Sequence, residues 1–332
     1  MNRRALVAAA GAVLAAILVF VFVGIGRDAT TTSEQQSEVL TDLAELADSA
    51  QAPGTVNDTA NESLAAALDE TATIDPPSPD AQDDFPAIVD SAVKDPDLRL
   101  EPAAASFEIL EVIPHDTGAF TQGLEIFDDR LFESTGLVGQ SSIRELDLDS
   151  GAVLRNTAVD NVFAEGLTIL GDTAIQLTWQ DGVAFRYDTE TFEQTETYTY
   201  EGEGWGLCHD DEQLVMSDGS PTLQFRDPGT FELRSTVDVT FAGVPVDELN
   251  ELECVDGTVW ANIWRSSLIV EIDPGTGAVL TVLNAATLTP PEVAGSSSAV
   301  LNGIAFDPTD GTFLLTGKLW PSIYRVRLTI DE

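Results

Sequence analysis

The chain has 332 residues, enough for one large domain with extensions or for two ordinary domains. Its 57 acidic residues against 15 Lys and Arg give a formal net charge of -42, which excludes the basic surface that nucleic-acid binding requires. Lysine occurs only as Lys94 and Lys318, and this acid-rich, lysine-poor composition is typical of halophilic proteins; a general acidic bias for solubility is the alternative.

The N-terminal segment contains an uncharged run from Ala5 to Gly26, preceded by Arg3 and Arg4. The run is long enough to cross a bilayer, and no clear A-x-A cleavage site follows it. Arginines before it and acids after it predict a cytoplasmic N-terminus. We therefore expect residues 1–26 to be a transmembrane helix that tethers an extracytoplasmic body to the cell membrane. A cleaved signal peptide, which would give a secreted protein, is the alternative.

The next segment, residues 27–106, contains 18 acids and 3 bases and is rich in Ala, Ser, Thr, Asp and Pro. Such a composition cannot bury enough apolar surface to fold and favours a disordered linker. We expect this acidic linker to hold the folded body away from the membrane.

From residue 107 to residue 332 the chain changes to short apolar runs separated by turns such as DSG and DPGTG. One motif recurs as FTQGLEI, FAEGLTI, GWGLCHD, LNELECV and LNGIAFD. Equivalent residues in the five copies, here called the anchors, stand 43, 40, 45 and 52 residues apart: Gly123, Gly166, Gly206, Glu251 and Gly303. Two or three further apolar runs follow each anchor strand. Four strands at this period indicate a β-propeller blade, so the sequence predicts an all-β, five-bladed propeller over residues 107–332.

The last repeat ends after its third strand, at Leu328, whereas an unassigned run, FEILEVI at residues 107–113, precedes the first anchor. We expect this N-terminal strand to complete the last blade, because that pairing closes the ring and removes a free sheet edge.

The two cysteines, Cys208 and Cys254, fall near the inner strands of adjacent repeats. Export permits a disulfide between them, and buried free thiols are the alternative. Side chains alternate between the two faces of a strand, which argues against pairing here. The spacing does not fit a metal site.

Polar and aromatic residues recur at one place in the repeats. The first strand of every blade lines the central channel, so the residues directly before the anchors should meet at one mouth: Gln122, Glu165, Trp205, Asn250 and Asn302. Trp179 and Trp264 follow their anchors by 13 residues, and Lys318 lies near the same place in the last repeat. With Phe120 they predict a small-ligand pocket with aromatic walls, one acid and one base. A channel merely filled by polar side chains and water is the alternative.

Several longer motifs resemble, in order, those of the plant- and bacterial-type glutaminyl cyclases: PHDTGAFTQGLEI, LFESTGLVGQSSIREL, FAEGLTIL, GWGLCHD, LNELE with VWANIW, and LNGIAFD with TGKLWP. The resemblance runs from about Val112 to Leu328. It implies a five-bladed propeller and a glutaminyl-peptide cyclotransferase, an acyltransferase that converts N-terminal glutamine of peptides and proteins to pyroglutamate with release of ammonia. It also implies that Glu165 transfers the proton. The other positions matching the family's active site are Lys318, Asn250 and Gln122, with Phe120, Phe163, Trp179, Trp205 and Trp264 around the substrate.

The chemistry explains why such a site needs one buried acid. The substrate's α-amine must lose a proton to attack the side-chain amide, and the leaving nitrogen must gain one to depart as ammonia, so one carrier serves both steps. Apolar neighbours should raise the pKa of Glu165 for this role. Lys318, Gln122 and Asn250 are the available donors to the oxyanion, and Asn250 could instead hold the α-amine through its carbonyl.

No cofactor is expected, and no catalytic zinc, because the only histidines, His115 and His209, lack metal-ligand spacing; a structural cation in the central channel is compatible with the sequence. We expect a monomer that acts on peptides beginning with glutamine. A non-catalytic extracellular propeller that binds its ligand without turnover is the alternative. A metal-dependent propeller hydrolase is disfavoured, because Glu165 is the only acid among the five equivalent positions.

Overall fold

The computed structural model describes residues 102–210 and 212–330. The expected anchor at residues 1–26 and nearly all of the expected linker lie outside this part. By its contacts the chain divides into residues 1–76 and 77–332, and every described residue belongs to the second unit. Within residues 102–210 and 212–330, no helix combines the length and the apolar character that crossing a membrane requires.

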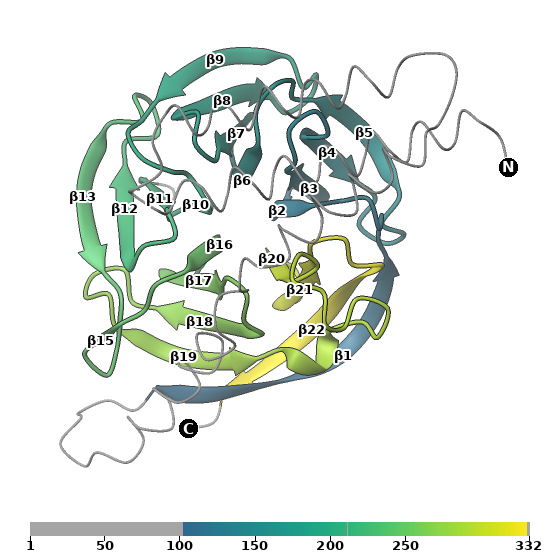
Figure 1. Ribbon diagram of the computed structural model, residues 1–332, viewed down its shortest axis with the longest axis vertical. Helices are drawn as coiled ribbons and strands as arrows, with labels where there is room; N and C mark the ends of the chain where they lie inside the picture. The colour runs from purple at the N-terminus through teal and green to yellow at the C-terminus, as the bar shows by residue number, and fades with distance from the viewer. Residues whose placement is uncertain (1–101, 211, 331–332) are drawn as a thin grey trace, which may run out of the picture. The chain divides into compact units, whose positions relative to one another are not determined.

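The described residues form an all-β structure, as predicted (Figure 1). Three four-stranded sheets each follow chain order, with antiparallel neighbours. The first contains β2 (Thr121–Phe127), β3 (Arg130–Thr135), β4 (Ser142–Leu146) and β5 (Val153–Ala158). The second contains β6 (Ala164–Leu170), β7 (Thr173–Thr178), β8 (Val183–Asp188) and β9 (Gln194–Thr199). The third contains β10 (Leu207–His209), β11 (Leu214–Met216), β12 (Thr222–Arg226) and β13 (Leu233–Asp238).

The last two repeats share one eight-stranded sheet of order β16-β17-β18-β19-β1-β22-β21-β20. One half contains β16 (Leu249–Val255), β17 (Thr258–Ile263), β18 (Leu268–Ile272) and β19 (Val279–Asn284). The other half contains β20 (Leu301–Asp307), β21 (Thr312–Gly317), β22 (Ser322–Ile330) and the N-terminal β1 (Ala103–Pro114). A short hairpin of β14 (Thr240–Phe241) and β15 (Val244–Pro245) and a 3-10 helix, η1 (Ala286–Leu288), complete the elements.

The N-terminal strand pairs with the last strand, as predicted. β1 runs antiparallel to β22 from Ala105 to Pro114. It begins at Ala103, four residues before the expected boundary at residue 107, and Ala103–Ala105 pair in parallel with Thr281–Leu283 of β19. This short parallel pairing, which the sequence did not predict, joins the fourth and fifth repeats into a single sheet.

The innermost strands β2, β6, β10, β16 and β20 follow one another around a common centre (Figure 1), and each contacts the next. This crowding explains the glycine anchors. A Cβ added to Gly166 would lie 2.6 Å from the backbone nitrogen of Leu207, and one added to Gly206 would lie 2.0 Å from the carbonyl oxygen of Asn250. Only glycine permits such a close approach of two backbones.

The fourth anchor, Glu251, uses its side chain to connect inner strands. Its carboxylate accepts backbone N–H bonds from Leu124 of β2 at 3.2 Å and from Ile304 of β20 at 2.8 Å. Glu251 therefore fixes β16 both to its neighbour β20 and to β2, the strand after β20 around the centre.

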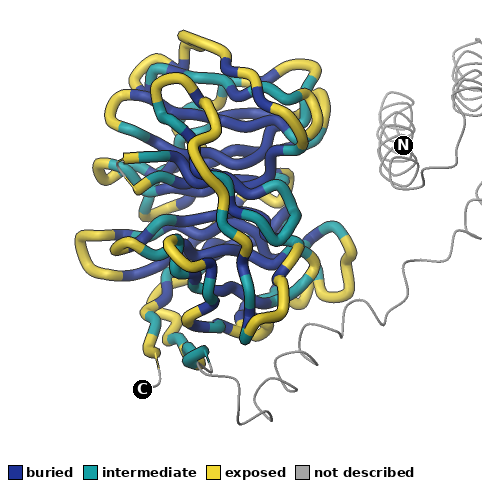
Figure 2. Tube along the Cα trace, turned by 90° about the vertical axis from the view of Figure 1, so that its left-hand side faces the viewer, coloured by how far each residue is buried: buried dark blue, intermediate teal, exposed yellow. Residues whose placement is uncertain are grey.

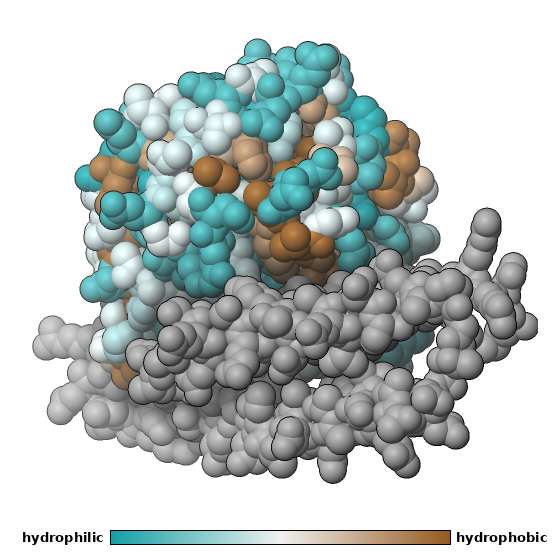
Figure 3. Space-filling model, turned by 45° about the horizontal axis from the view of Figure 1, so that its top comes forward, coloured by the Kyte–Doolittle hydropathy of each residue, from teal (hydrophilic) through white to brown (hydrophobic). Residues whose placement is uncertain are grey.

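Apolar side chains fill the spaces between successive repeats. Figure 2 shows the strands of the interior buried and many connecting loops exposed. The outermost strands, β1, β5, β9 and β13, are mostly exposed. Each interface between neighbouring repeats has its own cluster, represented by the pairs Phe132 and Leu167, Leu177 and Leu214, Val215 and Leu252, Trp260 and Ile304, and Leu314 and Leu124. On the face in Figure 3, apolar residues are interspersed with hydrophilic ones, as on a surface exposed to water.

Cys208 on β10 and Cys254 on β16 form a disulfide with Cα atoms 5.5 Å apart. The expectation that strand alternation disfavours this bond was wrong. Alternation limits contacts within one sheet, whereas these strands belong to different sheets whose faces meet, with Cys208 buried in their shared apolar cluster and Cys254 packed against it.

Candidate active site

Three of the residues before the anchors form a hydrogen-bonded row of buried side chains. Asn302 of β20 donates from Nδ2 to Oε1 of Gln122 at 3.2 Å and to the backbone carbonyl of Thr121 at 2.9 Å. Gln122 of β2 then donates from Nε2 to Oε1 of Glu165 on β6 at 2.7 Å. The row fixes the amide of Gln122 so that its NH2 group faces the carboxyl of Glu165.

Glu165 is the electrostatic centre of the row, with only 5% of its surface exposed. Burial raises its pKa well above the usual 4.5. The Lys318 ammonium acts in the opposite direction, the Glu203 carboxylate raises the pKa further, and the Gln122 hydrogen bond lowers it. Glu165 can therefore hold and release a proton at pH values where an exposed glutamate stays ionised.

Lys318 lies in the turn after β21 and is buried. Its backbone N–H donates to the carbonyl of Val300 at 2.9 Å, and its Nζ lies 5.0 Å from the centre of the Phe120 ring, a cation–π distance. Burial lowers the pKa of Lys318 from 10.5 to about 8, although the carboxyls of Glu165 and Glu251 favour its charged form. The lysine thus remains a cation at neutral pH.

The expected aromatic residues form two contact groups. In one, the rings of Trp205 and Trp264 meet edge to face with centroids 5.3 Å apart. In the other, Phe163 contacts both Trp179 at 5.7 Å and Phe120 at 5.9 Å, again edge to face. Trp205 is buried and the other four are half-buried, so the rings form a wall that still has open faces.

Glycines make room for this wall. Gly219 has a φ of +81°, and a Cβ there would lie 2.6 Å from the Trp205 ring. A Cβ on Gly136 would lie 2.4 Å from the Phe163 ring. Both rings therefore pack directly on backbone that no other residue could provide.

Asn250, on β16, is buried beside the anchor Glu251. Its backbone carbonyl accepts a hydrogen bond from Ser217 Oγ at 2.6 Å. Within the described residues its side-chain Oδ1 has no hydrogen-bond partner. An unpartnered buried acceptor is uncommon, and this one could receive an N–H group of a ligand.

Sequence analysis missed a carboxylate that contacts the wall. Glu203, in the connection between β9 and β10, accepts the indole N–H of Trp179 at 2.7 Å and that of Trp205 at 2.9 Å on the same oxygen, Oε2. A single acid gives little signal in a chain with 57 of them. The one feature that could have indicated Glu203 is its position in GEGWG, two residues before the expected site residue Trp205.

A buried ion pair, between His115 and Glu133, contacts the turn that contains Lys318. His115 donates from Nδ1 to the carbonyl of Trp320 at 3.0 Å, and its Nε2 lies 3.0 Å from Oε1 of Glu133. Burial alone would lower the pKa of His115, but the charge and hydrogen bond of Glu133 outweigh it and raise the pKa above 6.5. Neither residue was expected to contribute to the site.

No group of three or more His, Cys, Asp or Glu side chains in the described part of the chain is placed to hold a metal ion. The channel cation allowed by the sequence stays a prediction.

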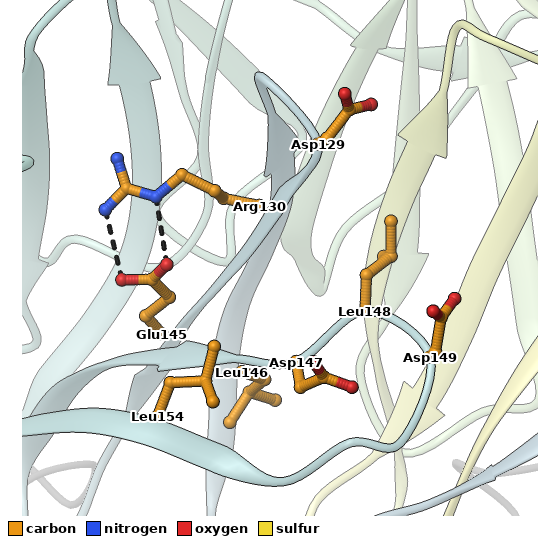
Figure 4. Close-up of a pocket in the computed structure, with 8 residues that line it drawn as sticks. All are labelled: Asp129, Arg130, Glu145, Leu146, Asp147, Leu148, Asp149 and Leu154. Carbon is orange, nitrogen blue, oxygen red and sulfur yellow. Dashed lines mark hydrogen bonds and ion pairs between the residues drawn. The ribbon is translucent and has the colours of Figure 1, made fainter.

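A hollow of about 360 Å³ lies away from this group, between the β3, β4 and β5 ends (Figure 4). Arg130 lines this hollow, and its guanidinium already donates two hydrogen bonds to the carboxylate of Glu145, at 2.9 and 3.0 Å. None of the residues in the expected site lines it. The candidate site is therefore the group around Glu165, where buried groups of opposite charge converge.

Comparison with known proteins gives consistent results. A family model described as glutamine cyclotransferase matches residues 87–328. A glutaminyl-peptide cyclotransferase from Arabidopsis thaliana is 39% identical over 236 residues, which cover 70% of this chain and 74% of the relative. The crystal structure of Myxococcus xanthus glutaminyl cyclase matches with a TM-score of 0.66 and 44% identity, over 70% of this chain and all of that one.

Proposed function

The chain belongs to the glutamine cyclotransferase family and is a glutaminyl-peptide cyclotransferase, and we propose that Glu165 carries the proton in its reaction. The substrate is a peptide or protein with N-terminal glutamine. The observation that carries the proposal is the buried Glu165 carboxyl, bonded to Gln122 at 2.7 Å and electrostatically coupled to Lys318.

The proton moves within one turnover. The carboxylate of Glu165 takes a proton from the substrate's α-amine as the amine nitrogen bonds to the side-chain amide carbon, whose π electrons move to oxygen. The carboxyl then delivers this proton to the amide nitrogen. The carbon–nitrogen bond breaks, the carbonyl re-forms, and pyroglutamate and ammonia leave with Glu165 again ionised.

The other groups serve the charge and geometry of this step. Lys318 is the cation available to the oxyanion, and the buried setting strengthens its effect. Asn250 offers its unpartnered Oδ1 to the α-amine. Gln122 keeps the Glu165 carboxyl in place. The aromatic residues Phe120, Phe163, Trp179, Trp205 and Trp264 exclude water and hold the side chain folded back on the amine.

The pH dependence of kcat/KM tests this assignment with a glutamine-initial peptide. Activity should fall toward acid pH as Glu165 is protonated, with an apparent pKa well above 4.5, and fall again above about 8 as Lys318 loses its proton. The same peptide with an acetylated N-terminus is the control and should release no ammonia. Undiminished activity down to pH 4.5 by folded protein would contradict the role of Glu165.

The arrangement of the protein is the second part of the proposal. The five repeats are the blades of a five-bladed β-propeller, a view supported by the closed series of inner-strand contacts and by the pairing of β1 with β22. Residues 1–26 tether this body, as a monomer, to the outer side of the cell membrane or are removed as a signal peptide. Protease treatment of intact cells should degrade the propeller, and protection would contradict an extracytoplasmic location.

A further inference from the structure

The two aromatic groups of the site are bridged by one carboxylate. Oε2 of Glu203 accepts both indole N–H bonds, from Trp179 and from Trp205, and Oε1 accepts Nε2 of Gln180 at 2.8 Å. Among the residues that the structure describes, the ring of Trp205 contacts that of Trp264, and the ring of Trp179 contacts that of Phe163. Glu203 is therefore a side-chain bridge between these two groups of rings.

The backbone holds Glu203 in position for this contact. The next residue, Gly204, donates its N–H to the carbonyl of Trp179 at 2.9 Å, and a Cβ on Gly204 would lie 2.3 Å from the hydroxyl of Tyr200. The N–H of Trp179 in turn donates to the carbonyl of Phe163 at 2.9 Å. The loop that carries the carboxylate is thus fixed to the strand end that carries one of its two indoles.

We propose that Glu203 is a positioning residue that sets the separation and tilt of the Trp179 and Trp205 indoles around the cyclising side chain. An indole N–H can only donate, so one ionised oxygen with two lone pairs is suited to hold two indoles at once. A neutral hydroxyl or amide in this place would form weaker bonds to the two donors.

The same carboxylate influences the proton carrier. The charges of the Lys318 ammonium and the Glu203 carboxylate both change the pKa of Glu165, and the charge of Glu165 in turn raises the pKa of the Tyr200 hydroxyl. Glu203 favours the protonated form of Glu165, opposite to Lys318. Removing its charge should therefore move the acid side of the pH profile toward lower pH, an effect that a purely structural contact would not produce.

The test compares Glu203→Gln, which keeps the shape and one acceptor oxygen, with Glu203→Ala, which removes both indole bonds, in the full-length chain. Glu201→Gln is the matched control, because it removes an exposed acid from the same loop. With Glu203→Ala we expect kcat/KM to fall about tenfold to hundredfold, mainly through KM, from the loss of two hydrogen bonds to a charged group. Both Glu203 variants should move the acid limb to lower pH.

Indole NMR provides the structural readout, because the chain has only five tryptophans. In ¹⁵N-indole-labelled protein, two N–H signals should shift together in Glu203→Ala and stay unchanged in Glu201→Gln. Unshifted indole signals, or an unchanged KM and acid limb in a folded Glu203→Ala chain, would overturn the proposal. The proposal for Glu203 rests on the proposed role of Glu165. Either of the two results above would contradict the role of Glu203 and leave the role of Glu165 intact. An active Glu165→Gln chain would instead contradict the role of Glu165.

Discussion

Replacing Lys318 by methionine should make the protein more stable and nearly inactive. Burial lowers the lysine's pKa from 10.5 to about 8. Keeping the ammonium charged in the folded protein at neutral pH therefore costs about 3 kcal/mol of folding free energy. Methionine has a similar length and no charge. The free energy of unfolding at pH 7 should rise by up to about 3 kcal/mol, because the neighbouring carboxyls of Glu165 and Glu251 can become neutral.

The sign of the pH dependence provides an internal check. Between pH 8 and 10.5 the unfolded chain keeps the Lys318 proton that the folded chain has released, so this group makes stability increase with pH across that window. The stability difference between the Lys318→Met variant and the wild type should therefore shrink from pH 8 to 10.5. Urea unfolding over this range measures it.

Activity gives the second half of the test. Loss of one oxyanion donor typically costs about two to three orders of magnitude in rate, so ammonia release by the folded variant should fall by that factor. A variant less stable than the wild type at pH 7 would refute the burial reasoning. A stable variant with undiminished turnover would refute the role assigned to the ammonium.

Two further predictions concern stability. Changing both Cys208 and Cys254 to alanine should lower the free energy of unfolding by up to about 4 kcal/mol, the chain-entropy value for a separation of 46 residues, with turnover per folded molecule preserved. Urea unfolding measures this, and a loss below about 1 kcal/mol would argue against the entropic origin. Gly219→Ala should raise KM as well as destabilise, because its Cβ would meet the Trp205 ring at 2.6 Å. Gly202 has a similar φ of +87°, with open space where a Cβ would lie, so Gly202→Ala is the control and should show only the backbone strain of about 1–3 kcal/mol. Equal KM values for the two variants would contradict the steric explanation.

The repeat carried most of the information that the sequence holds about the fold. A motif recurring every 40 to 52 residues located β2, β6, β10, β16 and β20, because close packing of these strands favours glycine at the same position in four of the five repeats, with Glu251 at that position in β16. The pairing of β1 with β22 followed from the incomplete last repeat. The parallel contact of Ala103–Ala105 with β19 could not be predicted, since an alanine run has no strand signature beside an acidic linker.

The candidate site was predictable where the repeat places its residues and not elsewhere. Gln122, Glu165 and Asn302 occupy equivalent positions, and their hydrogen bonds follow from that equivalence. Glu203 and His115 act on the site from connecting segments. Contacts between two connecting segments that are distant in the sequence depend on the folded path of the chain, for which local composition gives no pattern.

The most direct test of the account is ammonia release from a glutamine-initial peptide by the full-length chain and by its Glu165→Gln variant, with circular dichroism to compare their folds. Glutamine keeps the shape of the side chain but cannot take up the amine proton. The account predicts rapid release by the wild type and near-complete loss in an equally folded variant. A variant that turns over at the wild-type rate would show that another group carries the proton.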